Sequence, residues 1–117
     1  MSTALYSNIV TCRYSQLPNT LNNLKANTSI KISDPENVIL NSSSTPKSLG
    51  WIISHYTGSY LLDFSPSDFS NAKCTSGATD LFSNCTKLSG MCKLPASITY
   101  ASSMFYGCTS LASIDTS

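Results

Sequence analysis

The residues best suited to chemistry are five cysteines and one histidine, and their spacing decides what they could do. Structural zinc sites commonly pair Cys or His ligands separated by about two to four residues. The shortest interval between cysteines here, from Cys85 to Cys92, is longer than that, and His55 is the single imidazole. The sequence therefore predicts no metal site. Because the number of cysteines is odd, at least one thiol is free or paired with another chain.

Nucleophilic catalysis would need a base beside the nucleophile, and His55 is the only imidazole that could serve. Serine is abundant, yet the chain has neither the Gly-x-Ser-x-Gly turn of hydrolases nor a local cysteine-protease signature. His55 also falls at the polar side of an expected helix. We therefore expect no enzymatic activity and no catalytic residue. An enzyme would instead show a pocket that joins His55 to an activated nucleophile.

The sequence also lacks the patterns that catalysis by paired carboxylates or phosphate binding would need. Asp34 and Glu36 are the only acidic residues close together in the sequence, and they share a predicted turn. Acid and base pairing of the glycosidase kind therefore has no support. The chain lacks both the phosphate-binding loop and the dinucleotide fingerprint, so we predict no cofactor.

The composition describes one globular domain. A chain of 117 residues suits a single domain, and a charged fraction of only 11% excludes a charge-rich disordered tail. Formal net charge is +1 and the basic residues are scattered from Arg13 to Lys93, whereas nucleic-acid binding needs clustered positive charge. No apolar run reaches the roughly 18 residues that a membrane span needs. We therefore expect no nucleic-acid partner and no membrane span, and the first residues do not read as a signal peptide.

Short helices and strands must position these residues in the first half of the chain, residues 1–59. The composition of Ile9–Cys12 predicts a strand, and period-two alternation over Ser29–Ser33 predicts a half-buried one. Leucines spaced at helical intervals over Leu17–Leu24 predict a short helix between the two. The pattern further indicates a strand at Val38–Leu40 and a helix at Leu49–Tyr56 that ends by Gly58. A strand at Tyr60–Phe64 is expected directly after this half, at the start of residues 60–117.

An internal repeat occupies the second half, residues 60–117. Leu81–Leu88 and Met104–Leu111 carry Phe, Cys, Thr and Leu at matching positions, 23 residues apart. Repeats of about 20 to 50 residues indicate solenoids. A period this short suits one strand and one turn or short helical piece per coil.

Stacked coils would align equivalent side chains in columns, with Phe82 on Phe105, Cys85 on Cys108, and Met91 beside Ile114. Neighbouring coils lie about 4.8 Å apart, which would allow a disulfide between Cys85 and Cys108. Buried cysteines in a column also occur reduced, as small apolar residues, so both alternatives stay open. Cys92 lies off this column and is expected to be a free thiol.

Two segments carry a family resemblance. Met104–Ile114, with Cys-Thr-Ser-Leu at its centre, resembles the BspA-type leucine-rich repeat, and Leu62–Ser65 resembles the start of a related bacterial surface repeat. The interval from Leu88 to Pro95 is one residue longer than the family's spacing, and a β-bulge there would re-aim Lys93. The resemblance covers residues 60–117, about half of the chain. It implies a surface or secreted location and a role in adhesion or host interaction.

The predicted fold is α/β, with short helix-strand units in residues 1–59 that cap a leucine-rich-repeat-like solenoid with a small parallel strand ladder in residues 60–117. The predicted function is a non-catalytic module that holds a protein or glycan on an open strand face. Candidate contact residues alternate with core residues along the strands. They are Asp63, Cys92, Ser113 and Asp115.

The alternative function is structural. A repeat array with an open end exposes unpaired strand edge and apolar surface, which favours self-association. The chain would then be a self-assembling component of a cell envelope or particle, and would have no host ligand.

Overall fold

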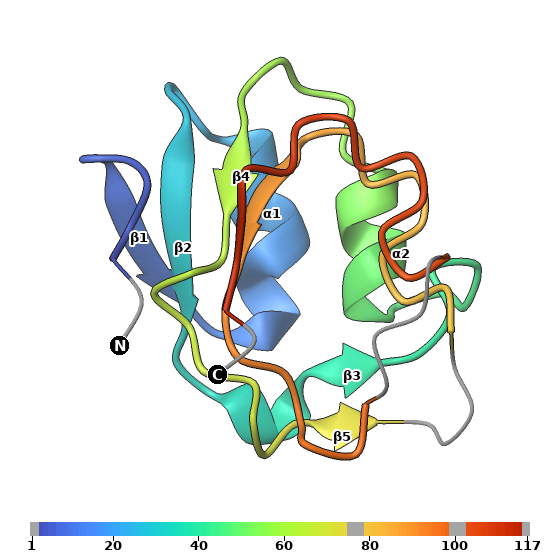
Figure 1. Cartoon of the computed structure of the whole chain (residues 1–117). Coiled ribbons are helices and arrows are strands. Elements are labelled where there is room, and N and C mark those ends of the chain that lie inside the picture. Colours follow the sequence, from blue (N-terminus) through green and yellow to red (C-terminus); the bar gives the residue numbers. More distant parts are fainter. Residues whose placement is uncertain (1–2, 75–78, 99–102, 116–117) are drawn as a thin grey trace.

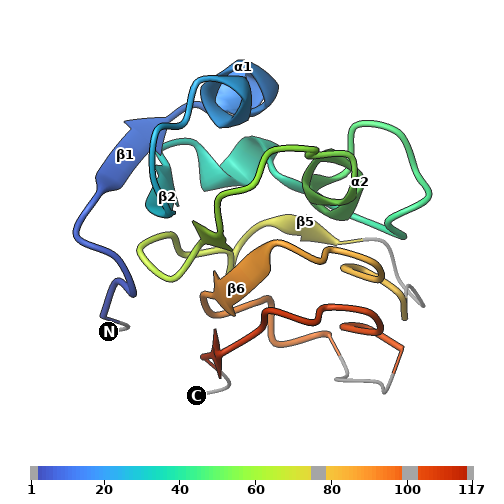
Figure 2. The ribbon, with the colours of Figure 1, turned by 90° about the horizontal axis from the view of Figure 1, so that it is seen from above.

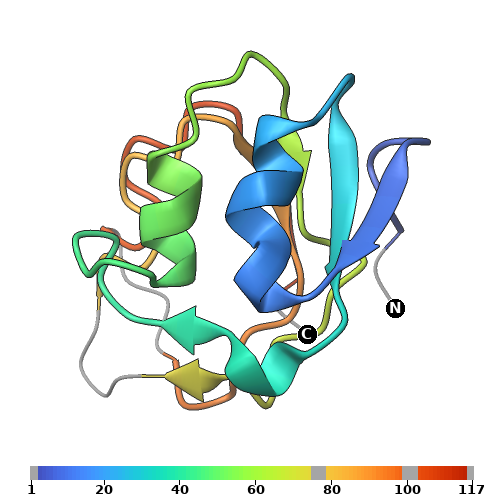
Figure 3. The same cartoon turned by 180° about the vertical axis from the view of Figure 1, so that it is seen from behind.

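A parallel β-sheet with helices on one face makes up the α/β fold (Figure 1, Figure 3). The computed structural model describes residues 3–74, 79–98 and 103–115. Within these residues the main sheet has five strands in the order β1-β2-β4-β6-β7, all paired in parallel. The strands are β1 (Ile9–Cys12), β2 (Thr28–Ile32), β4 (Leu62–Asp63), β6 (Leu88–Met91) and β7 (Ser113–Ile114).

The remaining elements lie in the connections between these strands. Parallel neighbours need a crossover, and every crossover here returns the chain to the next position of the sheet. Figure 2 shows the resulting layers from the helices down to the C-terminal end. The connecting elements are the helices α1 (Leu17–Asn22) and α2 (Leu49–Ser54), the 3-10 turns Tyr14–Gln16 and Pro35–Asn37, and a separate parallel pair, β3 (Ile39–Leu40) with β5 (Lys73–Cys74).

One hydrophobic core joins both halves of the chain. Leu17 and Leu21 of α1 and Ile30 of β2 are buried in it together with Phe64 and Phe82. Burial of each such side chain is worth about 1.5–3 kcal/mol. The apolar faces predicted for both helices and the parallel strands are confirmed, but α1 ends at Asn22 and not at the predicted Leu24.

Helix α2 begins at a capped end and stops earlier than the sequence pattern indicated. The Ser48 Oγ accepts a hydrogen bond from the Trp51 backbone N at 3.2 Å, which satisfies one of the first-turn amides. The expected extension to Tyr56 was wrong, because the helix ends at Ser54 and His55 forms its C-terminal cap.

The repeat offset of 23 residues is confirmed by the strand pairing. Gly90 lies opposite Ser113 and Met91 opposite Ile114. We call residues 80–92 coil A and residues 103–115 coil B; their traces nearly superpose in Figure 1 and stack in Figure 2. The Phe82 and Phe105 rings stack with centroids 5.5 Å apart and planes 14° apart.

The pairing of β4 with β6 is irregular where the long interval predicted a bulge. Leu62 pairs with Leu88, but the next residue, Asp63, pairs with Gly90. The strand β6 therefore carries one extra residue, Ser89, at this point. Lys93 beyond the strand is exposed.

Candidate functional site

The strand face does not offer the contact surface that the alternation predicted. Asp63, one of the predicted contact residues, is fully buried, so its side chain does not lie on an open strand face. The carboxylate accepts hydrogen bonds from the Leu5 backbone N at 2.9 Å and from the Ser29 Oγ at 2.6 Å. The Ser65 backbone N and Oγ donate two more, at 2.9 and 2.7 Å. The N-terminal segment 3–6 covers this part of the sheet, which the alternation pattern alone could not show.

Cys92, another predicted contact residue, is also buried, with only 1% of its surface exposed. The segment that contains Phe69 packs beside it, where the Phe69 backbone N donates to the Lys93 carbonyl at 3.1 Å. Burial, chiefly, raises the pKa of the Cys92 thiol to about 12. Ser113 is exposed and Asp115 is half-buried, so two of the four candidates stay near the surface, both at the edge strand β7.

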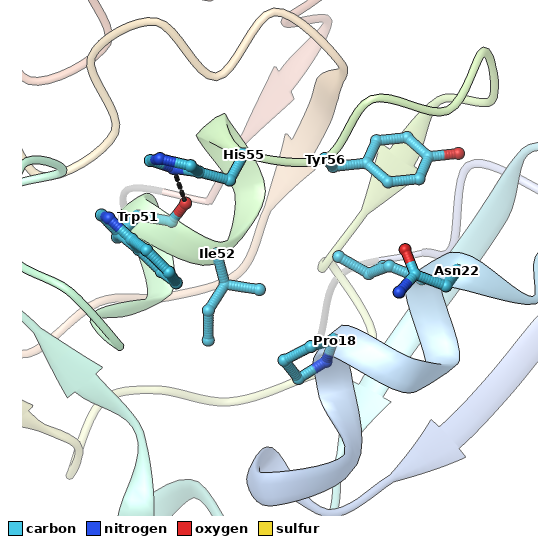
Figure 4. Close-up of a pocket in the computed structure, with 7 residues that line it drawn as sticks. Pro18, Asn22, Trp51, Ile52, His55 and Tyr56 are labelled. Atoms are coloured by element: carbon cyan, nitrogen blue, oxygen red, sulfur yellow. Dashed lines mark hydrogen bonds between the residues drawn. The ribbon is translucent and has the colours of Figure 1, made fainter.

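A second surface feature lies between the two helices. Helices α1 and α2 lie side by side (Figure 1, Figure 3), with a hollow of about 160 Å³ between them (Figure 4). Apolar, aromatic and polar side chains share its wall. The lining residues are Pro18, Leu21, Asn22, Trp51, Ile52, His55 and Tyr56.

A wider hollow of about 400 Å³ adjoins the first toward β3. Pro18 and Ile52 line both hollows, so the two hollows adjoin at these residues; we call them together the helix groove. Lys47 is the only charged residue among the lining residues of this second hollow. Its lining residues are Tyr14, Ser15, Pro18, Asn37, Ile39, Lys47 and Ile52.

Trp51 and His55 form an aromatic pair at the rim of the helix groove. They are one helical turn apart, and their ring centroids lie 4.3 Å apart with planes inclined by 31°. The His55 Nδ1 lies 2.9 Å from the Trp51 carbonyl oxygen (Figure 4). A carbonyl only accepts, so we assign the proton to Nδ1. In the neutral ring, Nε2 is then the acceptor that remains for a ligand.

This geometry does not make a nucleophile and base pair of Ser54 and His55. The Ser54 Oγ lies 3.3 Å from the His55 Nδ1, but that nitrogen carries a proton and cannot accept another. The Ser54 hydroxyl donates instead to the Trp51 carbonyl at 3.0 Å. The helix groove thus presents groups suited to binding: aromatic and aliphatic surface with a few polar atoms at its rim.

Tyr14 forms part of the groove wall, and its buried phenol should make the stability of the protein depend on pH in the alkaline range. Its hydroxyl donates to the Lys47 carbonyl at 2.7 Å, and burial raises the pKa of Tyr14 to about 12. A tyrosine in the unfolded chain ionises near pH 10, so the stability contribution of the neutral phenol is complete below about pH 10. It is lost as the pH rises through about 12.

We therefore expect a wild type whose stability falls more steeply above about pH 10 than that of a Tyr14→Phe variant. Urea unfolding of both proteins at about pH 8 and pH 11 measures the difference. Parallel pH dependence of the two proteins would contradict the burial of this phenol.

Among residues 3–74, 79–98 and 103–115 no group of three or more His, Cys, Asp or Glu side chains could hold a metal ion. Neither described helix is long and apolar enough to cross a membrane.

Comparisons of the chain with protein-family models, curated proteins and solved structures gave no match.

Sequence reasoning identified His55 but missed the groove around it. The helical patterns placed Leu21 and Ile52 on apolar faces, and both residues are buried in the structure. The missing information was which way α1 and α2 pack against each other. An exposed Pro18 in the first turn of α1 and a half-buried Trp51 away from the centre of the apolar face of α2 are local signs of a surface left open.

Proposed function

We propose that this chain is a non-catalytic recognition module that binds a polypeptide segment in the helix groove. The observation that carries the proposal is the character of the groove wall, which is mainly apolar and remains open to solvent. Ile39 is 39% exposed at the wider end, where a partner's apolar side chain would cover it. Such grooves anchor a few side chains of a partner and use sparse polar groups for orientation.

Polar groups at the narrow end suit the main chain of such a segment. The Asn22 side-chain amide can both donate and accept, and the His55 Nε2 can accept a peptide N–H. In Figure 4 both side chains lie at the hollow, with Asn22 at the end of α1 and His55 at the C-terminal cap of α2. A segment lying between the helices would thus meet partners on both sides.

We further propose that the scaffold is a leucine-rich-repeat-like solenoid of a surface or secreted protein. Its support is the 23-residue register of β6 with β7 and the stacking of Phe82 on Phe105. Solenoids of this kind present extended surfaces for partners and carry no fixed chemistry. Adhesion or host interaction is the role that the repeat resemblance implies for such a surface.

Selection from a random peptide library tests the binding proposal, followed by titration calorimetry of the selected peptides. We expect Ile39→Asp to weaken binding at least about tenfold, equivalent to about 1.4 kcal/mol, because it puts a charge where the apolar anchor lies. Asn22→Ala should weaken binding less.

Matched controls come from the same elements or residue types. Ile9→Asp changes an isoleucine that is 54% exposed on β1, away from the groove, and Asn19→Ala changes an asparagine of α1 outside it. Neither should affect binding. Peptides that bind Ile39→Asp as well as wild type would exclude the groove. A ligand found only on a glycan array would replace the polypeptide with a glycan.

The end of coil B favours a second candidate, a self-assembling structural repeat. Tyr106 is 70% exposed there, and Phe105 and Leu111 are only half-buried. In the described residues β7 pairs with β6 alone, so one strand edge is open. Light scattering over a range of concentrations distinguishes the candidates, since an assembling repeat forms oligomers and a strict monomer counts against that role.

A further inference from the structure

Two cysteines of successive coils, Cys85 and Cys108, lie against each other inside the molecule. Both are free thiols. The Phe82 carbonyl accepts from the Cys85 backbone N at 3.2 Å and from the Cys108 Sγ at 2.9 Å, which places the two cysteines side by side. Cys85 is fully buried in the core, whereas Cys108 is half-buried. The pair therefore has one sulfur shielded by the protein and one that solvent can reach.

The repeated turn explains why the two thiols meet. The residue before each cysteine has a left-handed backbone, with φ of 65° at Asn84 and 79° at Gly107. Each coil therefore makes the same turn and presents its cysteine in the same direction. Backbone hydrogen bonds from Phe82 N to the Met104 carbonyl, at 2.9 Å, and from Asn84 N to the Tyr106 carbonyl, at 2.6 Å, hold the coils in register.

The surroundings make the two sulfurs chemically unequal. The Cys108 Sγ donates to the Phe82 carbonyl at 2.9 Å as a thiol, and as a thiolate it would accept from Cys85. That hydrogen bond from Cys85 lowers the pKa of Cys108, and the same interaction together with burial raises the pKa of Cys85. Reactivity toward disulfides follows thiolate character and access, and both favour Cys108.

We propose that Cys85 and Cys108 form a dithiol site that is oxidised by low-molecular-weight disulfides of the glutathione type. The Cys108 thiolate attacks one sulfur of the small disulfide, forms a mixed disulfide and releases one thiolate. Cys85 then gives up its proton and attacks the Cys108 sulfur, which releases the second thiolate and closes the protein disulfide. Two protein thiols are oxidised, one small disulfide is reduced, and the two released thiolates take up the two protons.

The site differs in place and chemistry from the helix groove and does not depend on the proposed function. Its product would join coil A to coil B covalently. Cys85 is hydrogen-bonded to the Gly50 carbonyl of α2 at 3.4 Å, and no residue that lines the helix groove takes part in the reaction.

Peptide mapping after treatment with oxidised glutathione tests the proposal. Trypsin cleaves after Lys73, Lys87 and Lys93, so Cys85, Cys92 and Cys108 fall on three different peptides. Cys74 shares the peptide of Cys85, so the experiment uses the Cys74→Ser protein throughout. We expect loss of two hydrogen masses and a cross-link between the peptides of Cys85 and Cys108.

Single variants separate the two steps. Cys85→Ser should stop at one glutathione on Cys108, and Cys108→Ser should give neither an adduct on Cys85 nor a cross-link. Cys92→Ser is the matched control for a buried cysteine and should react like its parent. A cross-link that uses Cys92, or an unreactive Cys108 in the parent protein, would overturn the proposal.

A measurement on the parent protein covers the case in which a variant does not fold. Phenylarsine oxide bridges two adjacent thiols and is released by a dithiol but not by a monothiol. One equivalent should bind and slow alkylation of Cys108 by about tenfold or more, since the arsenic occupies its sulfur. Alkylation of Cys108 at an unchanged rate in the presence of the arsenical would show that the two sulfurs do not act together.

Discussion

Replacing Asp63 with alanine is expected to lower the free energy of unfolding by about 3 kcal/mol or more. The side chain is fully buried and accepts four hydrogen bonds, from Leu5, Ser29 and twice from Ser65. A hydrogen bond to a charged group contributes about 1.5–3 kcal/mol, and a buried donor left without a partner costs about 1–3 kcal/mol. Urea unfolding followed by circular dichroism measures the loss.

Asp68→Ala is the matched control, because Asp68 is exposed and its carboxylate accepts from the nearby Ser70 backbone N at 3.0 Å. It should cost no more than about 1 kcal/mol. Asp63→Asn keeps the shape of the side chain but replaces one carboxylate oxygen by an NH2 group, which faces neighbours that also donate. Its loss of unfolding free energy should lie between those of Asp63→Ala and Asp68→Ala. An Asp63→Ala protein as stable as Asp68→Ala would mean that the network under segment 3–6 does not stabilise the fold.

Gly50→Ala is expected to destabilise the protein by about 3 kcal/mol, although the same change usually stabilises a helix. Alanine in an open helix is favoured over glycine by about 0.8–1 kcal/mol. Here a Cβ on Gly50 would overlap the Leu81 carbonyl oxygen of coil A and lie 3.2 Å from the Ser43 Cβ. Neither backbone can yield without moving α2 away from coil A, and overpacking of that kind costs about 1–3 kcal/mol or more.

Ser54→Ala provides the control within the same helix. Ser54 is half-buried, and its side chain hydrogen-bonds only within or next to the helix, to the Trp51 carbonyl and at His55. Its replacement should change the unfolding free energy by less than about 1 kcal/mol. Thermal unfolding of both variants decides the matter. A Gly50→Ala protein that melts at or above the wild-type temperature would contradict the close packing of α2 on coil A.

Local patterns in the sequence predicted most elements of the fold. Strands at Ile9–Cys12 and near Ser29–Ser33 and the repeat offset of 23 residues are confirmed, because side-chain periodicity and spacing determine them directly. The offset also predicted which aromatic rings meet, since Phe82 and Phe105 occupy equivalent places in coils A and B.

Contacts between distant segments limited what could be predicted of the site. Alternation correctly turned Asp63 away from the apolar core, but whether that face meets solvent depends on where residues 3–6 lie. The helix groove depends in the same way on the packing of α1 beside α2, which no local pattern encodes. Ser113 on the edge strand β7 is exposed, because in the described residues β7 pairs on one side only.

Nuclear magnetic resonance mapping of a selected peptide on the labelled protein tests the central claim most directly. Binding in the helix groove should shift the signals of the Asn22 amide, the Trp51 indole and the Ile39 methyl groups, and leave those of Ser113 and Ile9 in place. Signal shifts confined to β7, with the Trp51 signal unchanged, would contradict this proposal. They would show that the peptide binds at the strand edge and not in the helix groove.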